Sequence, residues 1–198
     1  MISGENTILK YLENMKKNSE SESEIVEKMI TYLDVFTDGS EIKEKGTYKT
    51  LGLGWAFVVK ENKETTYSTN GSVCEGNNQR VELLAIYKAL KYILEHKNRL
   101  GTKFDITIHS DSDYSIKSLT LWSLNWVRND WMTSSKTQVK HRDIIEPCLQ
   151  MIKDLKTQHS IVFNHVRSHT NKKDFVHLGN AEADALATDA SKASLCSK

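Results

Sequence analysis

Four acidic residues stand in sequence contexts whose spacing could build a metal site. Asp38 lies in Phe-Thr-Asp-Gly-Ser, Glu82 in Asn-Gln-Arg-Val-Glu, Asp111 in His-Ser-Asp-Ser and Asp184 in Ala-Glu-Ala-Asp. Two carboxylates about 4 Å apart repel by roughly 4 kcal/mol at an effective dielectric constant near 20. Divalent cations would offset this repulsion, and all-oxygen ligands favour Mg²⁺ or Mn²⁺ over Zn²⁺. We therefore expect a carboxylate cage for metal if the fold brings the four residues together.

The order of the predicted elements could supply that convergence. We expect strands over 33–37, 51–60 and 65–73, a helix over 79–96, a strand over 104–109, short helices over 112–128, a helix over 142–157, a strand over 160–166 and a helix over 180–191. Three hairpin-like strands followed by alternating helices and strands predict an α/β fold, a mixed sheet with helices on its faces. Asp38 and Asp111 then end strands, while Glu82 and Asp184 lie about one turn into helices.

The 198 residues are enough for one good core and few for two. Residues 1–33 have helical spacing on either side of a serine- and glutamate-rich break. We expect a helical N-terminal extension over 1–33, which could contact a partner protein, and a single globular domain over 34–198. The formal net charge of +1 does not by itself indicate a polyanionic partner.

Several features predict an intracellular location, cytoplasmic or nuclear. No run of about 18 apolar residues occurs, which excludes a membrane span, and the first residues lack the basic and apolar blocks of a secretory signal. Cys74, Cys148 and Cys196 are far apart and in no metal-ligand spacing, so we interpret them as reduced thiols.

Each acid alone has an ordinary explanation. Asp38 could belong to a turn, Glu82 could be an exposed helix charge, Asp111 could cap the helix that begins at Ser112, and Asp184 could lie on the surface. Only their joint occurrence in one order, with a layout that could make them converge, indicates a site.

Further short motifs follow the same order along the chain. They are Thr37-Asp38-Gly39-Ser40, Gly52-Leu53-Gly54, Asn78-Gln79-Arg80-Val81-Glu82, Ser110-Asp111-Ser112, the series Trp122, Trp126 and Trp131, His165-Val166-Arg167-Ser168-His169, and Gly179-Asn180-Ala181-Glu182-Ala183-Asp184. Together they resemble the motifs of a type 1 ribonuclease H over about residues 33–192.

The resemblance implies an RNase H-like fold over 34–198, with a five-stranded sheet of three antiparallel strands and then parallel strands, flanked by helices. It implies an endonuclease that cuts the RNA strand of RNA–DNA hybrids with two Mg²⁺ ions, for which Mn²⁺ could substitute. The products would carry 3′-hydroxyl and 5′-phosphate ends. We expect a monomer with the hybrid as its partner.

The same resemblance assigns roles to the site residues. Asp38 would bridge the two metals, Asp111 would serve the nucleophile side, and Asp184 would complete one coordination sphere. Glu82 would hold the other metal close to the RNA 2′-hydroxyl, and His169 would transfer a proton or assist product release. Asp113 competes locally with Asp111, but it does not follow the strand directly.

Substrate contacts are also implied by the resemblance. RNA would be read in the minor groove, and DNA would lie over a protrusion between Lys117 and Arg142 that carries mainly basic charges. His141 stands where the family often has Asn in the DNA-phosphate pocket, and Glu75 stands where an arginine is expected. The expected RNA- and DNA-binding residues are Gly39, Ser40, Asn78, Gln79, Trp126, Thr133, Ser134 and His141.

Two other functions remain open at this point. The chain could be a non-catalytic module that binds RNA–DNA hybrids, although intact acids favour an enzyme. It could also be another structure-specific nuclease of the RNase H-like fold, although such nucleases place their acids in other contexts. A reverse-transcriptase fragment is disfavoured because no polymerase segment occurs.

Overall fold

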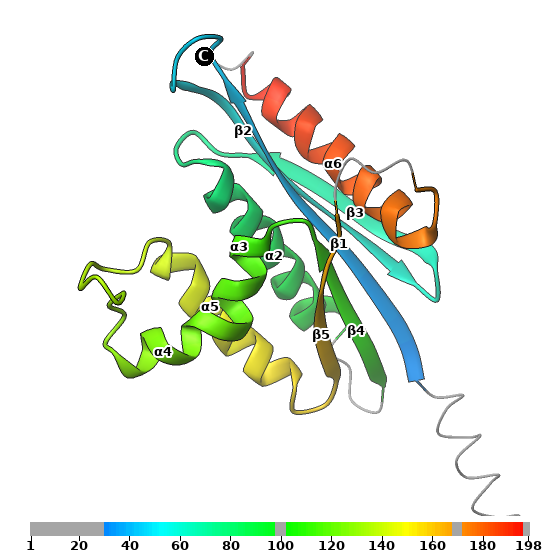
Figure 1. The fold of residues 1–198 in the computed structure, drawn as a ribbon. Helices are drawn as coiled ribbons and strands as arrows, with labels where there is room; N and C mark the ends of the chain where they lie inside the picture. The colour runs from blue at the N-terminus through cyan, green and yellow to red at the C-terminus, as the bar shows by residue number, and fades with distance from the viewer. Residues whose placement is uncertain (1–29, 98–101, 168–171, 196–198) are drawn as a thin grey trace, which may run out of the picture.

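The computed structural model describes residues 30–97, 102–167 and 172–195 (Figure 1). Five strands form one sheet in the order β3-β2-β1-β4-β5. β1 pairs antiparallel with β2, and β2 with β3, whereas β4 runs parallel to both β1 and β5. This confirms the predicted mixed sheet. The strands are β1 Ile30–Lys43, β2 Thr50–Glu61, β3 Glu64–Ser72, β4 Lys103–Ser110 and β5 Ser160–His165.

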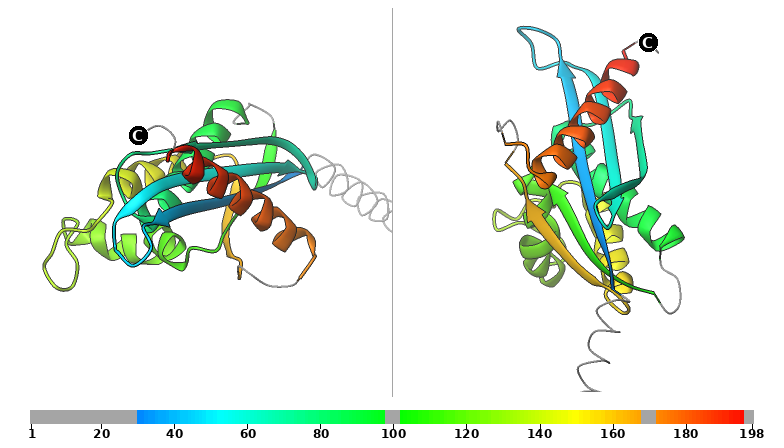
Figure 2. Two further views of the ribbon diagram at one scale, coloured as in Figure 1. Left: turned by 90° about the horizontal axis from the view of Figure 1, so that it is seen from above. Right: turned by 90° about the vertical axis from the view of Figure 1, so that its right-hand side faces the viewer.

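Helices cover both faces of the sheet (Figure 2). α2 packs on β1 and β2 with α5 behind it, and α6 packs across the other face on β1, β2 and β3. A short arm made of α3, η1 and α4 joins β4 to the loop before α5, and η1 is one turn of π-helix. The helices are α2 Asn78–His96, α3 Asp113–Lys117, η1 Ser118–Trp122, α4 Ser123–Arg128, α5 Arg142–Leu155 and α6 Phe175–Ala193.

The main core lies between the sheet and the α2 and α5 layer. Leu33 and Val35 of β1 pack there with Leu83 and Ile86 of α2 and with Ile145 of α5, and all five are fully buried. A smaller cluster under α6 contains Phe36, Val58 and Ala183. Alternate residues of β1 therefore supply the two faces of the sheet, as a strand covered on both sides requires. Within the described ranges, no helix combines the length and apolar character that crossing a bilayer needs.

Three expected boundaries are wrong. β1 continues to Lys43, six residues past its expected end at Thr37, because it stays paired with β2 as far as Thr50, so Asp38 lies within the strand and does not end it. β1 begins at Ile30, where it pairs with Lys103 of β4, so residues 30–32 are strand and not the end of a helix. α6 begins at Phe175, five residues before the expected start at Asn180, because Asp174 caps it by accepting a hydrogen bond from the backbone N–H of His177. Residues 1–29 lie outside the described residues, so the helical extension and the division of the chain at residue 34 stay predictions.

Gly54 allows β2 to approach α6 closely. A Cβ atom at Gly54 would meet the carbonyl oxygen of Ala187 and lie 2.5 Å from the backbone nitrogen of Ser191. Both are backbone atoms of α6, which cannot turn away as a side chain could. The absence of a side chain on Gly54 therefore sets the distance between the sheet and the helix that carries Asp184.

We expect Gly54→Ala to lower the free energy of unfolding by about 1–3 kcal/mol, the usual cost of forcing extra volume into a packed interior. Chemical denaturation monitored by circular dichroism measures it. Ser72, which is exposed and lies opposite Gly54 in β3, supplies the matched control, and Ser72→Ala should stay within about 0.5 kcal/mol of wild type. Equal stability of Gly54→Ala and wild type would contradict the packing argument.

Candidate active site

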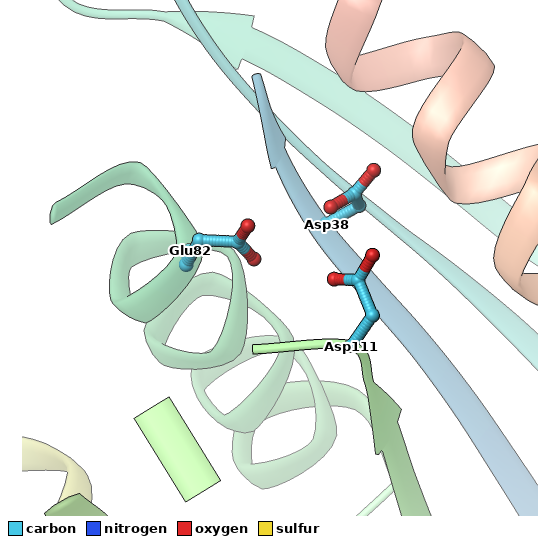
Figure 3. Close-up of side chains that lie close together, drawn as sticks. All are labelled: Asp38, Glu82 and Asp111. Carbon is cyan, nitrogen blue, oxygen red and sulfur yellow. The ribbon is translucent and has the colours of Figure 1, made fainter. Parts of the chain in front are cut away.

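Three of the four acids meet where β4 ends beside the middle of β1, in the centre of the sheet. Asp38 comes from β1, Glu82 from α2 and Asp111 from the residue after β4, and their carboxyl groups point toward one another (Figure 3). One carboxylate oxygen from each lies within 4.8 Å of the others. Asp38 is 4% exposed and Glu82 6% exposed, while Asp111 is half-buried. The predicted convergence is confirmed for these three residues.

Strand pairing places Asp38 beside Asp111. β1 and β4 are parallel neighbours, and Thr37 pairs with Ser110 in the last registered position. The next residue along each strand is therefore one of the two acids. A hydrogen bond from the Thr37 hydroxyl to the carbonyl oxygen of His109, 3.2 Å long, joins the strands directly behind them.

Two stacked aromatic rings lie on β1 and β4, two residues before Asp38 and Asp111. The rings of Phe36 and His109 stack with centroids 4.5 Å apart. His109 Nε2 lies 2.8 Å from Asp34 Oδ1, and the Asn164 side-chain amide donates to His109 Nδ1 over 3.0 Å. His109 therefore carries its proton on Nε2. Burial lowers the pKa of His109 despite Asp34, which agrees with a neutral ring.

Glu82 reaches the cluster because β1 passes close to α2 at Gly39. A Cβ atom at Gly39 would meet the Glu82 backbone nitrogen and lie 2.7 Å from the carbonyl carbon of Val81. The N–H of Gly39 donates to Asp38 Oδ1 over 2.8 Å. Gly39 thus holds the carboxyl group of one acid and gives room to the helix of another.

Asp184 lies at the rim of the cluster. Its carboxyl group is exposed on α6, and both its charge and a hydrogen bond with Asp38 raise the Asp38 pKa. The early start of α6 at Phe175 places Asp184 in the middle part of the helix, not one turn from its beginning. The fourth acid is therefore next to Asp38 but more accessible to water than the other three.

Burial and mutual repulsion dominate the electrostatics of the site. Burial first, then the charges of Asp111 and Asp184, raise the pKa of Asp38 to about 8, against the lowering effect of the Gly39 N–H. Burial, Asp38 and Asp111 likewise raise the pKa of Glu82, and Asn78 opposes them. Glu82 Oε2 is buried with no hydrogen-bond partner among the described residues. An unpartnered buried oxygen facing other carboxylates fits a divalent cation with oxygen ligands.

The local alternatives to Asp111 can be separated. Ser112, not Asp111, caps α3, because the Ser112 hydroxyl accepts from the backbone N–H of Ser115. Asp113 is exposed and pairs with Lys117 over 2.7 Å. Asp111 is therefore the acid of this segment that joins the site.

Histidine placement differs from the sequence-based expectation. His169 lies outside the described residues, so its catalytic role stays a prediction. His165, for which the sequence indicated no role, is the last residue of β5, and its Nε2–H donates to the carbonyl oxygen of Asp111 over 3.0 Å. This contact fixes the backbone of a site residue, and only the pairing of β4 with β5 could have indicated it.

The residues expected to read RNA lie around the acids. The Asn78 side chain donates to Glu82 Oε1 over 3.3 Å, and both Asn78 and Gln79 are exposed at the start of α2. The Ser40 hydroxyl lies 3.1 Å from that of Ser191, so it is half-buried between β1 and α6.

The residues expected to bind DNA lie on the arm and the loop after it. The half-buried ring of Trp126 packs 5.8 Å from Trp122. Thr133 Oγ1 lies 2.8 Å from the hydroxyl of Thr137, whereas Ser134 is exposed. The hydroxyl of Thr133 is thus already engaged within its loop.

His141 occupies a strained position beside an ion pair. It has φ 60°, in the left-handed region, at the residue before α5, and its Nε2 is buried without a partner in the described ranges. Arg80 and Asp143 form a two-pronged pair nearby with distances of 2.6 and 3.1 Å. Burial, and then the charge of Arg80, lower the pKa of His141. His141 is therefore mostly a neutral ring at pH 7.

Comparison with known proteins agrees with this geometry. Residues 30–192 match the family model described as RNase H. A ribonuclease H of Treponema denticola is 30% identical over 149 residues, covering 71% of this chain and 90% of that protein. A ribonuclease H of Schizosaccharomyces pombe is 34% identical over 153 residues, which are 77% of this chain and half of the yeast protein.

Solved structures share the fold. The crystal structure of LC9-RNase H1, a type 1 RNase H with the type 2 active-site motif, superposes with a TM-score of 0.65 at 20% identity, over 83% of this chain and 74% of that one. The RNase H domain of PFV gives 0.61 at 22% identity, over 83% and 94%. Together with the buried acids, the family match shows that this chain belongs to the RNase H family and is an enzyme with ribonuclease H activity on RNA–DNA hybrids.

Proposed function

We propose that the chain cuts the RNA strand of RNA–DNA hybrids by hydrolysis with two Mg²⁺ ions, leaving 3′-hydroxyl and 5′-phosphate ends. The observation that carries this proposal is the cluster of Asp38, Glu82 and Asp111, with carboxylate oxygens within 4.8 Å of one another and pKa values of Asp38 and Glu82 raised by burial. Mn²⁺ would substitute, because it accepts the same oxygen ligands.

Each acid has a role that its position supports. The charges of both Asp111 and Asp184 act on Asp38, so Asp38 lies between the other acids, as a ligand shared by two ions would. Asp111 would serve the nucleophile side, exposed Asp184 would complete one coordination sphere, and buried Glu82 would hold the other ion near the 2′-hydroxyl. Bound Mg²⁺ would supply the Lewis acid that activates water and stabilises the leaving 3′ oxygen. His169 would then transfer a proton or assist product release.

Substrate recognition would divide between the two strands. Asn78 and Gln79, exposed beside Glu82, would read RNA 2′-hydroxyl groups, and Gly39 and Ser40 would face the same strand. Trp126, Thr133, Ser134 and His141 would contact the DNA strand. We also propose a monomer, since all four acids come from one chain, and a reducing compartment, which the free thiols of Cys74 and Cys148 support.

A duplex panel tests the proposed function. RNA–DNA, RNA–RNA and DNA–DNA duplexes are incubated with the protein and Mg²⁺, and we expect cutting only of RNA paired with DNA. Asp38→Asn should bind the hybrid but lower kcat by about a thousandfold or more, because losing a metal clamp removes several kcal/mol of transition-state stabilisation. Wild-type protein that binds hybrid without cutting it would indicate a binding module, and cleavage of the other duplexes would indicate a different nuclease.

The raised Asp38 pKa predicts an unusual pH dependence of stability without metal. Folded protein keeps the Asp38 proton up to about pH 8, whereas the unfolded chain releases it near the ordinary value of 3.8. Between these values the folded state holds more protons, so the free energy of unfolding falls as pH rises. Histidines with lowered pKa act in the opposite direction, but only below about pH 6.5. Between about pH 7 and pH 8, the change of the free energy of unfolding with pH is therefore due to the buried carboxyl groups and not to these histidines.

In that window we expect metal-free protein to lose up to about 1 kcal/mol of stability per pH unit. Asp38→Asn should make this slope smaller, with the remainder due to Glu82, whose pKa burial also raises, and Mg²⁺ should raise Tm more at pH 8 than at pH 7. Thermal unfolding in EDTA and in Mg²⁺ measures both effects. A flat or rising stability of metal-free wild type between pH 7 and 8 would contradict the raised pKa.

A further inference from the structure

Glu41 is an acidic residue beside the site to which no role has been given. It lies on β1 three residues after Asp38, and its side chain is only 7% exposed. One carboxylate oxygen accepts from the Thr50 hydroxyl over 2.6 Å. The other accepts from the backbone N–H of Asn78 over 3.1 Å and lies 3.5 Å from Lys43 Nζ. A nearly buried carboxylate thus joins the β1–β2 hairpin to the start of α2.

The contact with Asn78 leads directly to the catalytic cluster. Asn78 is the first residue of α2, and its own side chain donates to Glu82 Oε1 over 3.3 Å. The N–H groups of a first helical turn have no partner within the helix and carry partial positive charge, so a carboxylate there is favourable. Glu41, Asn78 and Glu82 therefore form one hydrogen-bonded chain that ends at a predicted metal ligand.

We propose, on the basis of the function proposed above, that Glu41 is a positioning residue for ribose recognition. By holding the backbone of Asn78, it fixes the direction of the Asn78 amide, which faces both Glu82 and the substrate side. The amide then meets an RNA 2′-hydroxyl in one orientation. The Glu41 side chain is nearly buried, so it would act through Asn78 and not by contacting the substrate.

The burial pattern distinguishes positioning from simple stabilisation. Asn78 is exposed, so water can replace Glu41 at its N–H if the carboxylate is lost. The hairpin keeps the β1–β2 pairing that surrounds Glu41, from Ser40 opposite Gly54 to Lys43 opposite Thr50. Loss of the carboxylate should therefore change the orientation of Asn78 more than the stability of the fold.

The hairpin offers a matched control in Glu44. Glu44 is also an acid of this hairpin, but its carboxylate accepts from the Thr47 hydroxyl over 3.1 Å, and its backbone bonds to Lys49 and Thr47. Glu44→Gln removes the same charge from the same hairpin without touching α2. Long-range charge effects on hybrid binding are thereby separated from the effect on Asn78.

The test measures kcat and KM on an RNA–DNA hybrid and on hybrids that carry a single 2′-deoxy substitution near the cut. The proteins compared are wild type, Glu41→Ala, Glu41→Gln, Glu44→Gln, Asn78→Ala and the double variant that combines Glu41→Ala with Asn78→Ala. We expect Glu41→Ala to lower kcat/KM about tenfold, the scale of one charge-assisted hydrogen bond. In wild type, removing the 2′-hydroxyl that Asn78 contacts should lower kcat/KM. Glu41→Ala should make this 2′-deoxy penalty in kcat/KM smaller. The double variant should lose little beyond Asn78→Ala alone.

Glu41→Gln keeps an acceptor for the Asn78 N–H and should recover most of the activity, while Glu44→Gln should match wild type. Additive losses in the double variant, or an unchanged 2′-deoxy penalty in Glu41→Ala, would overturn the positioning role. If Glu41→Ala does not fold, Glu41→Asp, which keeps the charge but shortens the reach, decides by the same 2′-deoxy penalty. Wild-type protein that leaves every hybrid uncut would instead overturn the proposed function. The failure of the proposed function can therefore be told apart from the failure of the positioning role.

Discussion

Repulsion among buried carboxylates is the constraint on which the site depends. Asp38 and Glu82 are nearly inaccessible to water, and Asp111 lies within 4.8 Å of both. In the absence of metal, burial first and then this repulsion raise the Asp38 pKa to about 8, so the carboxyl group keeps its proton. A divalent cation would replace that proton with a stronger positive charge. The metal-free fold thus holds carboxyl groups close together at a cost in free energy, and a bound divalent cation would lower that cost.

The scaffold around this site is correspondingly rigid. β1 and β4 are parallel and in register up to the residues before Asp38 and Asp111, and the stacked rings of Phe36 and His109 lie directly behind them. Gly39 lets the backbone of α2 touch β1, so Glu82 projects from a helix whose position is fixed by main-chain packing. Carboxylates that repel one another can remain close only if the elements that carry them cannot separate.

Periodicity and motif order were sufficient to predict the sheet, its helices and the convergence of Asp38, Glu82 and Asp111. They did not predict the start of α6, because Gly179 and Asn180 are poor helix formers whose places are set by tertiary packing instead. Nor could they predict the contacts of His165 with Asp111 or of Glu41 with Asn78. Both contacts join residues more than thirty positions apart, and no local pattern encodes such a distance. His169 and residues 1–29 lie outside the described chain, so their predictions stand as made.

Carboxyl titration by ¹³C NMR tests the central claim most directly. With Asp38 assigned through the Asp38→Asn variant, its side-chain carboxyl carbon is followed from pH 4 to pH 9 in metal-free protein and again in saturating Mg²⁺. The account predicts a midpoint near 8 without metal and a fall of several units with Mg²⁺, since a bound cation favours the charged form. A midpoint near 4 in metal-free protein, or one that Mg²⁺ leaves unchanged, would contradict it.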